Sequence, residues 1–169
     1  DVRLALKEWQ SQCGRFAQER FDIIQIRNGK EIVTGTLDAN LAHYFGFRHR
    51  TVNALIITPE GQLVLQRRAH HKRSSPLDLS IYGGHVKSGQ SYHETIMKEE
   101  LPEELELADG EELEGKLVLV RKEGVFNWVQ KGNREVRSLY VYFATAEEME
   151  HILTTARDLE EKKAGMTEQ

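Results

Sequence analysis

One predicted helix, from about Tyr92 to Leu105, constrains the chain more than any other segment, because its acidic side chains would gather on one face. Glu100, Glu103 and Glu104 have the spacing i, i+3, i+4, which directs their carboxylates into a narrow strip of an α-helix. Like charges placed this way repel one another, and a bound divalent cation replaces the repulsion with coordination by hard oxygen ligands. The spacing therefore predicts a divalent-cation site, and the alternative is a solvated acidic face.

The composition indicates one ordinary globular domain. The chain has 169 residues and a net charge of −4, with 39% hydrophobic and 30% charged residues. No segment approaches the roughly 20 consecutive apolar residues of a membrane span, and the negative charge argues against nucleic-acid binding. Cys13 is the only cysteine, which excludes an internal disulfide and a cysteine-based zinc site. We expect a cytoplasmic protein that binds neither membranes nor nucleic acids.

Charge is distributed unevenly along the chain. Residues 67–73 are rich in basic side chains, whereas residues 94–114 are strongly acidic. Acidic side chains hold cations and basic side chains hold anions, so the two clusters together suit a metal-bridged phosphate. The basic cluster consists of Arg67, Arg68, Lys72 and Arg73, with two histidines between them.

Hydrophobic periodicity predicts a mixed order of helices and strands around one sheet. Residues 1–19 and 147–163 have the helical spacing of apolar residues. Strands are expected at residues 21–26, 32–36, 52–58, 62–66, 77–82, 117–121, 125–130 and 136–144, with hairpin turns at residues 28–29 and 59–61. We therefore expect an N-terminal amphipathic helix over residues 1–19 and one α+β domain over residues 20–169.

The segment GGHVKSGQSYHETIMKEELPEELEL, residues 83–107, resembles the Nudix box, a loop, helix and loop written G-x5-E-x7-R-E-U-x-E-E-x-G-U. Gly84 takes the glycine, Glu100 the first helical glutamate, and Glu103 and Glu104 the paired glutamates. The resemblance implies the Nudix fold, a mixed β-sheet sandwiched between α-helices. It also implies that these three glutamates hold Mg²⁺, with Mn²⁺ as an alternative, and that Glu103 and Glu104 are catalytic, one acting as base toward water.

The segment departs from the box at several positions. Gln90 stands where the loop glutamate is expected, Glu106 replaces the second glycine, and the usual arginine is missing. One residue too many lies between Gln90 and Glu100, so an uninterrupted helix would split its apolar stripe between two faces. Looping out one residue as a π-bulge rotates the second half by about 100° and restores a single apolar face. We predict such a bulge, or a kink, at about Lys98 to Pro102.

Three histidines extend the resemblance to the isopentenyl diphosphate isomerase branch of the same superfamily. His43, His49 and His85 fall where those isomerases place three metal-ligating histidines, and three converging imidazoles suit zinc or a transition metal. The alternative for each histidine is a hydrogen-bonded structural role. Arg68 and Lys72 match basic residues that contact the diphosphate in that branch.

The isomerase chemistry itself lacks a required group. The isomerases need a cysteine two residues before the third histidine to protonate and deprotonate an allylic carbon, and Gly83 occupies that position. They also supply two glutamate ligands from a later strand, where only Glu135 lies in the right region. Isomerase activity is therefore an alternative rather than the leading hypothesis.

The leading hypothesis is Mg²⁺-dependent hydrolysis of a diphosphate linkage in a nucleoside diphosphate derivative or a similar small molecule. Arg68, Lys72 and Gly84 are expected to contact the substrate, and a homodimer that completes the site is left open. Besides the isomerase, a degenerate Nudix domain that binds a ligand without catalysis is an alternative, which the departures at Gln90 and Glu106 favour.

Overall fold

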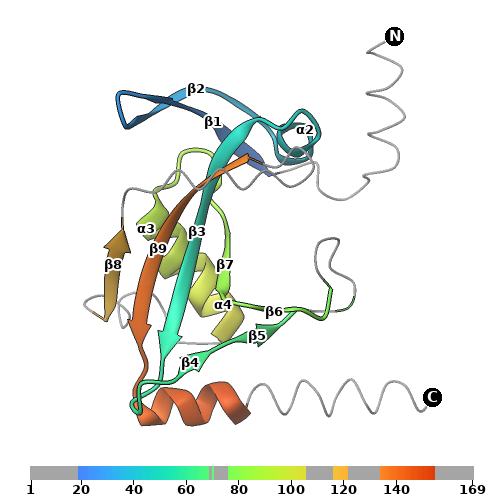
Figure 1. Cartoon of the computed structure of the whole chain (residues 1–169). Helices are drawn as coiled ribbons and strands as arrows, with labels where there is room; N and C mark the ends of the chain where they lie inside the picture. Colours follow the sequence, from blue (N-terminus) through green and yellow to red (C-terminus); the bar gives the residue numbers. More distant parts are fainter. Residues whose placement is uncertain (1–18, 69, 71–75, 106–115, 122–133, 155–169) are drawn as a thin grey trace, which may run out of the picture. The chain divides into compact units, whose positions relative to one another are not determined.

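A computed structural model describes residues 19–68, 70, 76–105, 116–121 and 134–154 of the chain (Figure 1). The expected N-terminal helix, apart from its final residue, and the strand expected at residues 125–130 lie outside these residues. The chain divides into two units. Unit 1 contains residues 1–51, 85–92 and 123–138, and unit 2 contains residues 52–84, 93–122 and 139–169.

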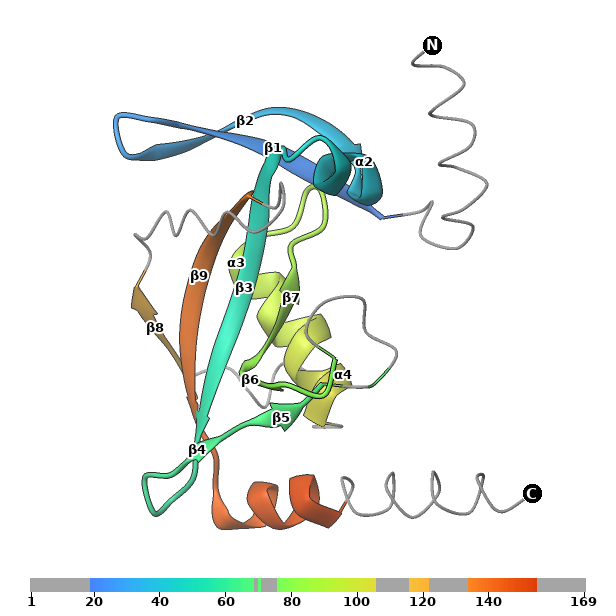
Figure 2. The same ribbon diagram turned by 45° about the vertical axis from the view of Figure 1, so that its right-hand side comes forward.

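The described part of unit 1 contains an antiparallel hairpin of two strands, β1 (Arg20–Arg27) and β2 (Lys30–Asp38) (Figure 2). The turn residues Asn28 and Gly29 have φ angles of 52° and 71°. These are the left-handed values that a two-residue hairpin turn requires. The hairpin predicted around this turn is confirmed.

Helix α2 (Ala39–Tyr44) is short and is closed at both ends by hydrogen bonds. Asp38 caps its start by accepting hydrogen bonds from two N–H groups of the first turn. At its end Gly46 has a φ of 66°, and its N–H donates to the carbonyl of His43. The N–H of Phe47 donates to the carbonyl five residues earlier, which completes the glycine-terminated cap. The backbone around His43 is therefore firmly held.

A mixed sheet has the strand order β4–β3–β9–β8, with β7 paired to β3. Strands β3 (Arg48–Ile57) and β9 (Arg134–Phe143) run in the same direction (Figure 1), while β4 pairs with β3 and β8 pairs with β9 antiparallel. Burial mostly alternates along both long strands, because successive side chains point to opposite faces. The shorter strands are β4 (Leu63–Val64), β5 (Gln66–Arg67), β6 (Leu79–Ser80), β7 (Tyr82–His85) and β8 (Leu117–Arg121).

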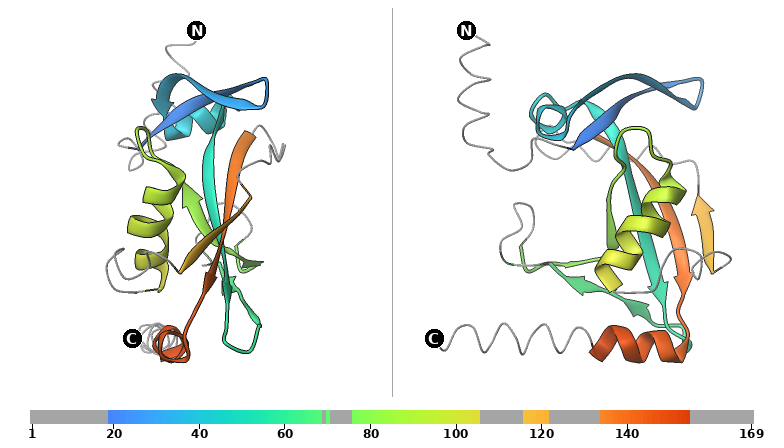
Figure 3. Two further views of the ribbon diagram at one scale, coloured as in Figure 1. Left: turned by 90° about the vertical axis from the view of Figure 1, so that its left-hand side faces the viewer. Right: turned by 180° about the vertical axis from the view of Figure 1, so that it is seen from behind.

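The acidic helix, drawn as one continuous yellow-green coil in Figure 3, consists of three consecutive parts. These are α3 (Tyr92–Thr95), the π-helical turn η1 (Ile96–Glu100) and α4 (Leu101–Leu105). The N–H of Leu101 donates to the carbonyl of Ile96, five residues earlier. Ile96, Leu101 and Leu105 are 0%, 0% and 2% exposed, so the apolar residues before and after the turn share one buried face. The predicted bulge is confirmed, although it begins two residues earlier than expected.

Residues 146–154 are helical, and the remainder of the helix expected at residues 147–163 lies outside the described part of the chain. A capping box begins this helix. The N–H of Thr145 donates to Oε2 of Glu148 at 2.7 Å, and the N–H of Glu148 donates to Oγ1 of Thr145 at 3.2 Å. None of the helices in the described residues is long and apolar enough to cross a membrane.

Candidate metal sites

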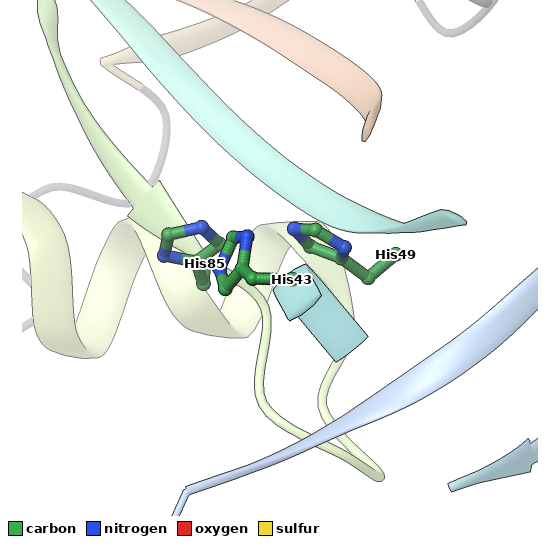
Figure 4. Close-up of side chains that lie close together, drawn as sticks. All are labelled: His43, His49 and His85. Atoms are coloured by element: carbon green, nitrogen blue, oxygen red, sulfur yellow. The ribbon is translucent and has the colours of Figure 1, made fainter. Parts of the chain in front are cut away.

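Three histidine side chains of unit 1, carried by three different elements, converge (Figure 4). His43 comes from α2, His49 from β3 and His85 from the end of β7. One ring nitrogen of each lies within 4.8 Å of a ring nitrogen of each of the others. The structure thus brings together all three histidines that the sequence analysis selected, and their binding of a metal stays a prediction.

The imidazole rings pack on the side chain of Phe21, which is 1% exposed. The phenyl ring stacks on His49 and His85 at centroid distances of 5.0 and 4.9 Å and meets His43 edge-on at 5.7 Å. His43 in turn meets the other two imidazoles edge-on at 4.6 and 5.0 Å. Because these ring contacts restrict rotation of the side chains, the three imidazoles are oriented by the fold itself.

Hydrogen bonding determines which nitrogen of His49 can bind an ion. Nδ1 lies 2.9 Å from the carbonyl oxygen of Phe47, which can only accept, so Nδ1 carries the proton and Nε2 the lone pair. Nε2 is buried and has no hydrogen-bond partner among the described residues. A buried polar atom without a partner costs free energy, and a metal ion would satisfy this lone pair.

The surroundings keep two of the histidines, His49 and His85, in the neutral form that metal binding requires. Burial, together with the nearby His49 and His43, lowers the pKa of His85 to about 4. Burial also lowers the pKa of His49. At neutral pH both side chains therefore present an uncharged imidazole.

A buried carboxylate lies close enough to the cluster for its charge to raise the pKa values of His49 and His85, although burial outweighs it. It belongs to Glu135 in β9, which is 6% exposed. Its Oε2 accepts hydrogen bonds from Oγ1 of Thr51 at 3.3 Å and from Nε of Arg137 at 2.7 Å. Imidazole nitrogens beside a carboxylate are a donor set that suits zinc and first-row transition metals.

The glutamates of the acidic helix lie in unit 2, at and after the π-helical turn. Glu100 is the last residue of η1, and Glu103 and Glu104 belong to α4. Because regular helix follows the turn, the backbone gives the three residues the spacing of one helical face. Glu100 is half-buried and Glu103 is exposed, whereas the side chain of Glu104 lies outside the described part of the structure. Convergence of the three carboxylates on one ion stays a prediction.

Gly84 in β7 leaves the space that the Glu100 carboxylate fills. A Cβ at this position would lie closer than 3.0 Å to Cδ and to both carboxylate oxygens of Glu100. The glycine that matches the Nudix box and the first helical glutamate are therefore in direct contact, in spite of the extra residue between them. Carboxylate oxygens are the hard donors that Mg²⁺ prefers, so the residues present fit this ion.

Gly83 adopts a backbone conformation that excludes a side chain. Its φ of 146° lies in the region that favours glycine. A Cβ there would lie 2.5 Å from Nδ2 and 2.8 Å from Cα of Asn53, and closer still to the carbonyl oxygen of Val52. The carbonyl oxygen of Val52 and Cα of Asn53 are backbone atoms of strand β3 and cannot move aside cheaply. The cysteine that the isomerase reaction needs does not fit at this position.

The basic residues expected to contact phosphate are described in part. Arg68 is half-buried; its N–H donates to the carbonyl of Asp78 at 3.0 Å, and its carbonyl accepts from the N–H of Leu77 at 3.1 Å. These two bonds extend the β5–β6 hairpin by one residue pair, which holds the Arg68 backbone in place. Lys72 lies outside the described residues, and substrate contact by either residue stays a prediction.

Gln90, which replaces the loop glutamate of the box, fastens the turn between β7 and α3. Its Oε1 accepts a hydrogen bond from the N–H of Lys87 at 3.2 Å, and its own N–H donates to the carbonyl of Lys87 at 3.1 Å. An amide oxygen serves this purpose without adding negative charge. The departure from the box thus has a local structural role in this chain.

Sequence reasoning missed three residues around the histidine cluster, namely Phe21, Thr51 and Arg137. A buried apolar residue in a short strand carries no local signal of a functional site. The packing of Phe21 on the imidazoles, and the hydrogen bonds of Thr51 and Arg137 to Glu135, depend on pairing between strands far apart in the sequence.

The mixed sheet and the contact between Gly84 and Glu100 agree with the Nudix class of proteins that residues 83–107 resemble. The NUDIX domain family model matches residues 47–164, and the chain belongs to this family. The crystal structure of DR0079 from Deinococcus radiodurans has a TM-score of 0.61 and 27% identity, covering 76% of this chain and 74% of that chain. The expected Nudix fold is therefore confirmed.

Two relatives share parts of the sequence. An uncharacterized Nudix hydrolase of Nostoc sp. is 42% identical over 59 residues, which is 34% of each protein. A Nudix hydrolase of Deinococcus radiodurans is 36% identical over 88 residues, which is 51% of this chain and 49% of that protein. The matches thus span about a third and about half of the lengths of these relatives.

Proposed function

We propose that the protein hydrolyses a diphosphate linkage in a small molecule, a nucleoside diphosphate derivative or a similar compound, and depends on Mg²⁺. The observation that supports this most directly is the contact between Gly84 and the Glu100 carboxylate. The π-helical turn accompanies this contact of Glu100 with Gly84, although the helix contains an extra residue. The names of the two sequence relatives, both Nudix hydrolases, are consistent with this reaction class.

In this proposal Glu100, Glu103 and Glu104 hold Mg²⁺, with Mn²⁺ as the alternative ion. The ion, when bound, neutralises charge on the phosphate oxygens and helps to orient the attacking water. Glu103 or Glu104 takes a proton from that water while the water oxygen forms a bond to phosphorus. The bridging P–O bond breaks, and the bridging oxygen leaves with the second product.

The substrate phosphates are held by positive charge and by close approach of the backbone. Arg68 and Lys72 would donate charge-assisted hydrogen bonds to phosphate oxygens. Gly84 would contact the substrate through its main chain, because the Glu100 carboxylate fills the space of the missing side chain. These interactions would hold a diphosphate whatever group is attached to it.

A second ion, of the zinc or first-row transition class, is proposed for the histidine cluster. The buried, unpartnered Nε2 of His49 and the depressed pKa of His85 support a ligand role for His43, His49 and His85. This cluster is also the feature by which the sequence resembles the isopentenyl diphosphate isomerase branch. Isomerase activity itself is disfavoured by Gly83, because a cysteine there would overlap the backbone of β3.

The test is a turnover assay with Mg²⁺ on nucleoside diphosphates, nucleotide sugars and prenyl diphosphates. We expect release of phosphate or a monophosphate by the wild type, and at least about 100-fold slower release by Glu103→Gln or Glu104→Gln if one is the base. The exposed Glu147→Gln serves as control. No turnover of any compound by the wild type would favour a ligand-binding Nudix domain. Turnover by both variants that equals that of the wild type would favour it as well. Conversion of isopentenyl to dimethylallyl diphosphate would favour the isomerase.

A further inference from the structure

A buried ion pair joins three segments of unit 1. Asp22 in β1 is 6% exposed and forms a salt bridge with Arg50 in β3. It also accepts hydrogen bonds from Oγ of Ser88 at 2.6 Å and from the N–H of Gly89 at 3.3 Å, in the turn after β7. Burial alone would raise the pKa of Asp22, but these donors and Arg50 outweigh burial and hold the pKa below its ordinary value. Asp22 is therefore ionised at neutral pH.

Both members of the pair are neighbours in sequence of residues in the histidine cluster. Asp22 follows Phe21, on which the rings of His49 and His85 stack. Arg50 follows His49 in β3. A shift of either charged residue along its strand would therefore move a ring of the cluster as well.

Main-chain hydrogen bonds repeat the same connections. The N–H of Val86, the residue after His85, donates to the carbonyl of Arg50 at 3.0 Å. The N–H of Ser88 donates to the carbonyl of Arg20 at 2.7 Å. The segments that carry Phe21, His49 and His85 are thus tied together by both main-chain and side-chain bonds.

Tyr92 extends the network toward β9. The guanidinium of Arg50 lies 5.7 Å from the centre of the Tyr92 ring, within the range of a cation–π interaction. The Tyr92 hydroxyl donates to Oε1 of Glu31 at 2.9 Å and lies 3.4 Å from the carbonyl oxygen of Val136. Val136 follows Glu135, whose carboxylate acts on the pKa values of the cluster.

We propose that Asp22 and Arg50 are positioning residues for the histidine cluster. The pair holds β1, β3 and the turn at residues 86–89 in the one register that stacks His49 and His85 on Phe21, and so prepares the cluster for an ion. A buried ion pair contributes little net stability relative to well-packed apolar residues, but its geometry can specify one arrangement. This role rests on the metal site proposed above and concerns its preorganisation.

The first test examines the full-length protein without metal. Proton NMR cross-peaks between the Phe21 ring and the imidazoles of His49 and His85 are expected in the wild type, because the ring centroids lie 5.0 and 4.9 Å apart. Asp22→Asn should weaken these cross-peaks at least twofold, because an uncharged amide no longer neutralises Arg50. Unchanged cross-peaks in this variant would overturn the proposal.

The second test measures Co²⁺ affinity and the visible Co²⁺ spectrum, at a temperature at which all variants are folded. Asp22→Asn should bind Co²⁺ about tenfold more weakly, the size of effect seen when groups that orient metal ligands are removed. Glu148→Gln is the control, because it removes an ion pair and a helix cap in unit 2. Equal weakening by Glu148→Gln would reduce the role of Asp22 to general stability and overturn the proposal.

A milder variant covers the case in which Asp22→Asn does not fold. Ser88→Ala removes one hydrogen bond to Asp22 and keeps the salt bridge, so it should shift the NMR cross-peaks and the Co²⁺ affinity in the same direction by a smaller factor. No shift in either quantity would count against positioning. If the wild type does not bind Co²⁺ and the variants still show weaker cross-peaks, the proposed metal site fails while positioning of the rings is supported.

Discussion

Gly84 is expected to matter for Mg²⁺ binding, because a methyl group at this position would displace the Glu100 carboxylate. Replacing it with alanine would place Cβ where the Glu100 carboxylate now lies, and the end of a flexible side chain yields before the backbone does. We expect Gly84→Ala to stay folded but to bind Mg²⁺ at least about tenfold more weakly, because one ligand leaves its position. Calorimetric titration with Mg²⁺ measures the affinities of the wild type and of Gly84→Ala.

A matched control for this substitution is Gly35→Ala. Gly35 has open space around its would-be Cβ and no positive φ. Its substitution should leave Mg²⁺ affinity unchanged. Equal affinity of Gly84→Ala and the wild type would show that Glu100 does not contribute to the ion site.

The His49 side chain is expected to be a metal ligand of the histidine cluster. Its Nε2 is the buried nitrogen without a partner in the described structure, so His49→Ala should remove a metal ligand and weaken Zn²⁺ binding by at least about 100-fold. The exposed His93→Ala is the control. Competition with a chromophoric chelator measures both affinities, and equal affinities would show that the cluster is a packing arrangement of histidines.

In the acidic helix, the π-helical turn is expected to accommodate the one extra residue. Deletion of the exposed Lys98 removes the extra residue, so the turn can become regular α-helix without rotating Leu101 away from the core. Insertion of alanine after Lys98 demands a second bulge. Deletion should change the midpoint of thermal unfolding by less than about 4 °C, and insertion should lower it by more, because about 1 kcal/mol corresponds to several degrees. Equal loss in both variants would show that the turn does not absorb the extra residue.

The helix that begins after Thr145 is expected to make the stability of the protein depend on pH. Burial alone would raise the pKa of Glu148, but hydrogen bonds from Lys116 Nζ at 2.5 Å and from the Thr145 N–H lower it to about 2. Because this folded-state pKa lies below its ordinary value of 4.5, the stabilisation is complete above pH 4.5 and is lost as pH falls toward about 2.

Glu148→Gln should therefore lower the free energy of unfolding by about 1 to 2 kcal/mol at pH 7, allowing for the partly exposed Lys116. The difference from wild type should shrink below pH 4.5. Denaturant unfolding at pH 7 and pH 3 measures it, with the exposed Glu147→Gln as control. A difference that is constant with pH would show that Glu148 acts without its charge.

For the whole molecule, ion binding and folding are thermodynamically linked. A ligand that binds only the native state stabilises it by about 2.7 kcal/mol at one hundred times its dissociation constant. Addition of Mg²⁺ should therefore raise the midpoint of thermal unfolding of the wild type, and chelation should reverse the rise. Glu100→Gln should show little rise, whereas a rise equal to that of wild type would place the ion elsewhere.

Across the described residues, local features of the fold were predictable from the sequence and the exact bounds of some strands were not. The hairpin at Asn28 and Gly29 and the π-helical turn were predictable, because local turn chemistry and apolar spacing act over a few residues. The strand expected at residues 77–82 forms instead as the short β6 and then β7, which continues to residue 85. The positive φ of Leu77, at 66°, marks a turn that composition does not reveal.

The candidate sites were predictable as residue types and not as surroundings. The convergence of His43, His49 and His85 followed from a resemblance, whereas the Phe21 ring beneath them and the Asp22 pair came only from strand pairing over long separations. Such contacts depend on register between distant strands, which periodicity in one segment does not encode.

The π-helical turn also determines how positions of this chain correspond to those of other Nudix proteins. Residues from Gly84 to Thr95 correspond to Nudix-box positions counted forward from the glycine. Glu100 and the residues after it correspond to positions counted backward from the end of the motif. An alignment without a gap would equate Glu99 with the first glutamate and assign a ligand to a residue turned by about 100° on the helix. The insertion therefore belongs inside the helix, at residues 96–100, where alignment gaps are normally avoided.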